Sequence, residues 1–105
     1  MSNQIKEQIE FSYFEREMPD DILTVSALVD CMVEIMASPE TKINGVMLSQ
    51  KTLTPYIKNV DSCIIREFME HMRGKSLKGV NNITAYYRSC FINYLREQEL
   101  SKMVI

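Results

Sequence analysis

The sequence predicts a mainly α fold, a compact bundle of about five helices with one small β-hairpin, in a single domain over residues 1–105. Apolar residues make up 46% of the chain, which is enough to build a core and excludes a disordered composition. Glycine and proline occur only three times each, whereas a sandwich or barrel needs turn residues at short intervals. Apolar side chains also recur with a helical period over most of the chain.

The first third of the chain predicts one long helix after a short leading segment. The apolar residues within 4–16 fit either a short helix or an extended segment. Pro-Asp-Asp at 19–21 then indicates a helix start, because aspartate side chains accept hydrogen bonds from the free N–H groups of a first turn. That helix runs from Ile22 to Met36, and Pro39 should end it by Ala37. Its inward stripe is Val25, Leu28, Val29, Met32, Ile35 and Met36.

A hairpin and a short helix should follow. Asn44-Gly45 separates two β-prone runs within residues 41–48, and this pair suits a type I′ turn, which needs positive φ at both central residues. A two-stranded ribbon is only marginally stable alone, so the hairpin should lean on the helices. Ser49 can cap a helix that continues through Lys58. The inward residues of that helix are Leu53 and Ile57.

Two further helices complete the predicted bundle. Asp61 is a good N-cap for the first of them, and Gly74 suits its C-terminal stop. The inward stripe of this helix is Ile64, Ile65, Phe68, Met69 and Met72. After a basic loop, Asn81 or Asn82 caps the last helix, which runs to about Lys102. The inward stripe of the last helix is Ile83, Tyr87, Cys90, Phe91, Tyr94 and Leu95.

The sequence offers little for catalysis, for cofactors or for membrane insertion. His71 is the only histidine, and no glycine-rich phosphate loop, nucleophile elbow or paired metal-ligand motif occurs. Cys31, Cys63 and Cys90 are widely spaced among apolar residues, which favours buried free thiols in a reducing cytosol over a zinc site. No apolar run is long enough to span a bilayer. We therefore expect a cytoplasmic protein that is not an enzyme, with no cofactor, no small-molecule substrate and no membrane contact.

Charge is divided unevenly along the chain. Residues 1–50 carry nine acidic and three basic side chains, whereas residues 51–105 carry nine basic and five acidic ones. This division indicates either a basic face or two halves that attract one another in the fold. The candidate surface for a protein or nucleic-acid partner combines the basic loop at 74–79 with the outward side of the last helix. Its residues are Arg73, Lys75, Lys78, Tyr86, Arg88 and Arg96.

The segment from Val80 to Leu95 resembles the closing signature of the C-terminal domain of the replication initiator A family of Gram-positive plasmids and mobile elements. That signature reads asparagine-isoleucine, two residues, tyrosine-leucine, aliphatic, asparagine, and the domain is similar to the DnaD-like domain of primosomal proteins. Earlier segments match the family in the same order. They are Ile5 to Phe14, the helix Val25 to Met36, the hairpin Ile43 to Leu48 and the helix start within Ile57 to Phe68.

The resemblance implies an accessory module from a longer initiator. In such proteins a separate N-terminal winged-helix domain reads origin DNA, and the C-terminal module recruits host primase or helicase-loading proteins. A flexible tether of this kind raises the effective concentration of a partner without requiring tight binding. Two alternatives stay open on the sequence: direct binding of single-stranded or non-specific DNA, and a role as an oligomerisation module.

Overall fold

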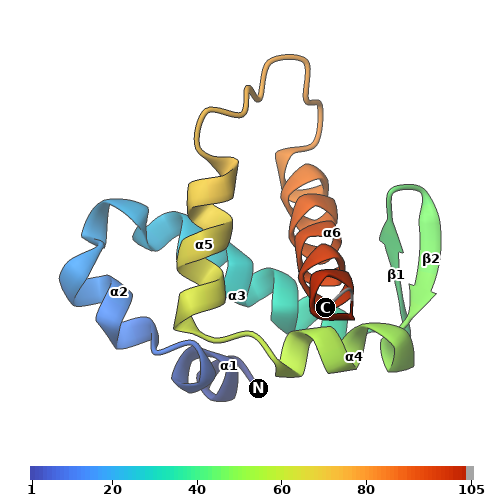
Figure 1. The fold of residues 1–105 in the computed structure, drawn as a ribbon, viewed down its shortest axis with the longest axis horizontal. Helices are drawn as coiled ribbons and strands as arrows, with labels where there is room; N and C mark the ends of the chain where they lie inside the picture. The colour runs from blue at the N-terminus through green and yellow to red at the C-terminus, as the bar shows by residue number, and fades with distance from the viewer. Residues whose placement is uncertain (104–105) are drawn as a thin grey trace.

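Six α-helices and one two-stranded sheet make up residues 1–103, the part of the chain that the computed structural model describes (Figure 1). In chain order the elements are α1 (Ser2–Gln8), α2 (Phe11–Glu17), the 3-10 turn η1 (Pro19–Asp21), α3 (Ile22–Ala37), β1 (Glu40–Ile43), β2 (Val46–Ser49), α4 (Gln50–Lys58), α5 (Ser62–Met72) and α6 (Ile83–Met103). The prediction of a mainly α bundle with one small hairpin is confirmed. The radius of gyration is 13.6 Å, as expected for a compact chain of this length.

The leading segment folds as two helices, α1 and α2, so the described residues contain six helices where the sequence predicted about five. The chain turns between α1 and α2 at Glu10, whose φ of 58° places it in the left-handed region. A glutamate adopts this conformation at a cost, because its Cβ crowds the backbone. The Glu10 carboxylate offsets part of that cost by accepting a hydrogen bond from the Ser62 hydroxyl at 2.8 Å. This contact ties the α1–α2 corner to the start of α5.

Three predicted N-caps are present. Ser49 accepts from the backbone N–H of Thr52 at 3.1 Å, and Asp61 accepts from that of Ile64 at 2.9 Å. Asn82, the second of the two residues considered, accepts from the backbone N–H of Ala85 at 3.0 Å. Each bond satisfies one of the free N–H groups of a first helical turn.

The predicted cap at the start of α3 was wrong. No side chain caps this helix, because Pro19 begins a 3-10 turn that leads directly into it. Asp21 turns instead toward α5, where its carboxylate lies 3.8 Å from the guanidinium of Arg73. Asp21 thus links the start of α3 to the end of α5 and does not cap α3.

The hairpin forms around the predicted turn. Glu40 pairs with Ser49 and Ile43 with Val46 in an antiparallel register. The turn residues Asn44 and Gly45 have φ values of 52° and 79°, as a type I′ turn requires. The Asn44 N–H donates to the Ser89 hydroxyl of α6 at 3.2 Å, so the hairpin leans on a helix as expected.

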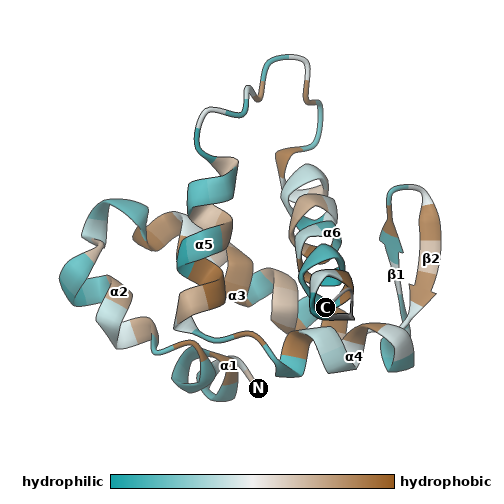
Figure 2. Ribbon diagram, viewed as in Figure 1, coloured by the Kyte–Doolittle hydropathy of each residue, from teal (hydrophilic) through white to brown (hydrophobic). Residues whose placement is uncertain are grey.

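The core runs along α3, whose hydrophobic stretches lie behind α5 inside the bundle (Figures 1 and 2). On α6 two details of the predicted stripe were wrong: Ile83 is 51% exposed, and Ile92, which the stripe omits, is fully buried. Helix α6 is covered on two sides. Phe91 meets Phe68 of α5 at a ring distance of 5.0 Å, while β1 and α4 pack on another side. A single stripe therefore underestimates its buried face.

One long-range polar contact fastens the first helix to the middle of the chain. The Gln8 side-chain amide donates to the carbonyls of Ile57 and Val60 at 2.8 and 2.7 Å. Gln8→Ala should lower the free energy of unfolding by about 1 kcal/mol, because the Val60 carbonyl loses its side-chain donor while the Ile57 carbonyl keeps its backbone N–H partner. Urea denaturation would measure the change. The exposed Gln4 on the same helix supplies the control, and an equal effect of Gln4→Ala would refute this role of Gln8.

Candidate functional site

An apolar groove lies between α3 and the first turn of α6, beside the loop at 73–82, and has a volume of about 310 Å³. Leu23 of α3, Leu77 of the loop and Ile83 of α6 line it. These side chains are 83%, 37% and 51% exposed, although all three are large and apolar. Large apolar side chains that gather around one concavity on a monomer are typical of a binding surface.

The loop holds Leu77 at the groove through its own turns. Gly74 and Gly79 have φ values of 80° and 84°, a conformation that glycine adopts without steric cost. Between them the Lys78 N–H donates to the Ser76 hydroxyl at 3.1 Å, and the Val80 N–H donates to the Leu77 carbonyl at 3.0 Å. In Figure 1 this segment arches between the ends of α5 and α6.

Charged side chains flank the groove at two ends. Exposed Asp30 and Glu34 lie on α3, one and two turns beyond Ala27, which lines the groove. Exposed Lys75 and Lys78 lie on either side of Leu77 in the loop. Within residues 1–103 none of these four charges takes part in an ion pair. The hollow that adjoins the groove along α3 therefore carries acidic side chains, and the loop that supplies Leu77 carries basic ones.

Arg88 of α6 reaches the groove and the hollow next to it, which Asp30 and Glu34 also line. Its Nε atom is buried and has no hydrogen-bond partner among the described residues. Its guanidinium forms no ion pair within that part of the chain. A buried N–H without an acceptor carries a desolvation cost that a bound acceptor would remove.

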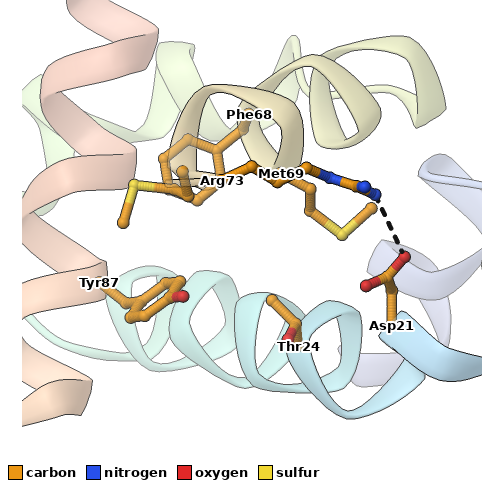
Figure 3. A pocket seen from close by; sticks show the side chains of 7 residues that line it. Asp21, Thr24, Phe68, Met69, Arg73 and Tyr87 are labelled. Carbon is orange, nitrogen blue, oxygen red and sulfur yellow. Dashed lines mark ion pairs between the residues drawn. The ribbon is translucent and has the colours of Figure 1, made fainter. Parts of the chain in front are cut away.

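A second hollow of about 170 Å³ lies between α3 and α5 (Figure 3). Arg73 reaches across its mouth to Asp21 at 3.8 Å and also contacts Glu70 at 3.1 Å. Phe68 and Tyr87 line the hollow, and Tyr87 also borders the apolar groove. The pair joins an acid of the first half of the chain to a base of the second half.

The structure does not gather the six predicted surface residues into one patch. Arg73 is paired, Lys75 and Lys78 lie on the exposed loop, and Arg88 lies at the groove. Tyr86 is half-buried, and its pKa is raised chiefly by a side-chain hydrogen bond with Cys90. Arg96 is exposed about 15 Å farther along α6 than Tyr86. Arg88 is the only one of the six that lines the groove as described, and Lys75 and Lys78 lie in the loop near Leu77, which also lines it.

Sequence reasoning missed the groove residues Leu23, Leu77 and Ile83, and the acidic pair Asp30 and Glu34. A signal for part of the set is present in the sequence. Leu23 and Ala27 lie outside the inward stripe of α3 and share a helical face with Asp30 and Glu34. No local pattern places Leu77 beside this face, because its position depends on how the loop folds back.

The three thiols are free, but they differ in burial. Cys31 is buried and Cys90 half-buried, whereas Cys63 is exposed and its thiol lies 3.5 Å from the Glu67 carboxylate. The expectation of three buried thiols was therefore wrong for Cys63, which lies on the outer face of α5. Among the described residues no group of histidine, cysteine and acidic side chains could hold a metal ion. None of the described helices is long and apolar enough to cross a membrane.

Burial raises the pKa of the Cys31 thiol from 9.0 to about 11, and nearby Arg88 offsets part of that rise. The folded state favours the protonated thiol. Its contribution is complete below about pH 9, where the unfolded chain is also protonated, and is lost as the pH rises to about 11. The loss should reach about 2–3 kcal/mol. Urea denaturation of wild type and Cys31→Ala at both ends of this range measures it, and identical pH dependence in the two proteins would contradict it.

The chain matches no protein-family model, no curated protein and no solved structure. Neither a family nor a function therefore follows from a relative. The resemblance to the replication initiator A family stays a prediction that rests on the order and spacing of its motifs. What the molecule itself offers toward a function is the apolar groove and the charges that flank it.

Proposed function

We propose that the chain is a protein-recruitment module of a plasmid-type DNA replication initiator, acting in the cytoplasm by bringing host primase or helicase-loading proteins to an origin. The apolar groove lined by Leu23, Leu77 and Ile83 carries the recruitment part of this proposal. Apolar side chains in a concavity suit a protein partner, whereas a nucleic-acid site depends mainly on phosphate contacts. The replication part rests on the motif resemblance of Val80 to Leu95.

A groove of this size supports modest affinity, which agrees with recruitment through a tether. An interface centred on a few apolar anchors buries less surface than a standard stable complex. In the proposed initiator the winged-helix domain holds the origin, so the module needs only to raise the local concentration of its partner. Exchange of the partner during initiation is easier when binding is modest.

Capture of purified host primase and helicase-loading proteins by the full chain tests the proposal. Leu23→Glu should weaken capture at least about tenfold, because it places a charge in the apolar groove. Leu100→Glu is the matched control, since Leu100 is 61% exposed on α6 and does not line the groove. Absence of binding at high micromolar concentration, or equal losses in the two variants, would contradict recruitment through this groove.

Direct binding of single-stranded DNA is a second candidate, favoured by Lys75 and Lys78 on the exposed loop, neither of which forms an ion pair with another described residue. If it holds, changing both lysines to glutamate should weaken binding of an oligonucleotide, and the affinity of the wild type should fall as salt rises. Binding that is absent or independent of salt would exclude this candidate.

Self-association through apolar surface is the third candidate. Sedimentation across a concentration series separates an oligomer from a monomeric adaptor. The exposed apolar side chains at the groove would then be buried between copies, so Leu23→Glu should shift the protein toward the monomer. A monomer at all concentrations would exclude this role.

A further inference from the structure

We propose that the groove binds an amphipathic helix of a partner protein that carries basic residues at one end and acidic residues at the other. Its apolar face would fill the groove, its basic end would lie over Asp30 and Glu34, and its acidic end beside Lys75 and Lys78. This rests on the proposed function only in requiring a protein partner. It adds the secondary structure and the charge pattern of that partner.

The face of α3 that borders the groove and the adjoining hollow is long enough to accommodate a helix. The stretch of α3 from Leu23 to Glu34 is about 16 Å long, or about three turns. Leu23 and Ala27 line the groove at one end, and Asp30 and Glu34 continue the same helical face into the adjoining hollow. A helix laid along this face presents anchors at three- and four-residue spacing to the groove.

The charges select the occupant further. Asp30 and Glu34 are four residues apart on one helix face, so their like charges repel each other; Arg88 lines the same hollow but forms no ion pair with either acid among the described residues. A basic side chain placed over them would relieve this repulsion. At the other end, Lys75 and Lys78 offer exposed cations without ion-pair partners among the described residues. An occupant with charge of a single sign would be repelled at one of the two ends.

Arg88 supplies a polar contact between the two ends. Its buried Nε–H lacks an acceptor in the described part of the chain, although the side chain borders both the groove and the acidic hollow. An amide or carboxylate oxygen of the occupant at this point would satisfy the donor. A polar residue between the apolar anchors and the basic end of the partner helix fits this position.

A second copy of the chain fits the groove less well. A two-fold contact would place groove against groove, and two facing hollows leave unfilled space between them. Leu23 is the most exposed of the large apolar side chains that line the groove, and it lies on the rim. One leucine from each copy would bury too little surface for a stable dimer.

The test uses the full chain and two labelled synthetic helical peptides of about 18 residues, long enough to cover the groove. Both peptides carry leucine along one face; one has lysine in one half and glutamate in the other, and the second has glutamate in both halves. Fluorescence anisotropy should show at least about tenfold tighter binding of the first peptide. In the variant Asp30→Lys with Glu34→Lys, this preference should reverse.

Both substituted positions are exposed, and a thermal melt checks that the variant stays folded. An unchanged preference in the variant, or no binding of either peptide at about 0.5 mM, would overturn the inference. Self-association that is lost in Leu23→Glu would also overturn it, because a second copy would then occupy the groove. If the peptides bind as expected but host primase does not, the groove binds a helix as inferred, and the proposal that it recruits primase is contradicted. If primase binding depends on Leu23 but not on Asp30 and Glu34, the proposed recruitment through the groove is supported, and the inferred charge pattern of the partner helix is contradicted.

Discussion

Replacing Phe68 with alanine should lower the free energy of unfolding by about 3–5 kcal/mol, because it removes a large side chain from the core. The Phe68 side chain is fully buried, and its ring contacts those of Phe91 at 5.0 Å and Tyr94 at 5.5 Å. Phe68 therefore packs α5 against α6, the two helices that the loop at 73–82 connects. Because small domains are stable by only about 5–15 kcal/mol, the variant should be largely unfolded in mild denaturant.

Urea denaturation followed by circular dichroism measures this loss. His71→Ala is the matched control, because the His71 ring lies 6.5 Å from that of Phe68 on the same helix and is exposed to solvent. The control should change stability by less than about 1 kcal/mol. Comparable losses in the two variants would mean that Phe68 does not hold the two helices together.

Local chemistry explains why much of the fold could be predicted from the sequence. The turn at Asn44-Gly45 and the caps at Ser49, Asp61 and Asn82 each involve residues at most three positions apart. Such contacts form wherever the chain supplies the side chain and the backbone conformation. Gly74 has a positive φ just after α5, but the chain already leaves the helix at Arg73, whose backbone is extended, so the glycine begins the loop and does not itself end the helix.

The failures share a different cause, since each depends on packing between distant segments. Asp21 was expected to cap α3, but its carboxylate lies near Arg73 across the hollow. Ile92 is buried because β1 and α4 cover a side of α6 that a single helical stripe does not reveal. Ile83 is exposed because the first turn of α6 borders an open groove. A periodic pattern gives the face of one helix but not the number of its neighbours.

The candidate site likewise combines features that the local sequence predicts with features that depend on packing between distant segments. The charge pattern predicted Lys75, Lys78 and Arg88 as surface residues; Arg88 lines the groove, whereas the two lysines are only neighbours of the groove residue Leu77 in the loop. The apolar part was missed because it unites α3 with the loop and α6, which come much later in the chain: Leu23 and Leu77 are 54 residues apart. Leu77 and Ile83 look like ordinary core residues until the fold shows them exposed beside Leu23.

Arg88→Met should raise the free energy of unfolding by about 1 kcal/mol and yet weaken binding in the groove. The buried Nε–H of Arg88 has no acceptor among residues 1–103, so its removal ends a desolvation cost while the methionine keeps most of the packed volume. The loss of attraction to Asp30 and Glu34 across the hollow offsets only part of this gain, because both acids are exposed.

The opposite signs of the two effects distinguish a binding residue from a structural one. Urea denaturation gives the first, and anisotropy with the peptide of mixed charge gives the second, for which a loss of about tenfold is expected. Arg96→Met, at an exposed position farther along α6, should change neither quantity appreciably. If Arg88→Met destabilises the fold by 1 kcal/mol or more, the arginine supports the bundle itself. Unchanged affinity would mean that no acceptor meets Arg88 in the complex, so that only the apolar anchors and the charges at the two ends select the partner.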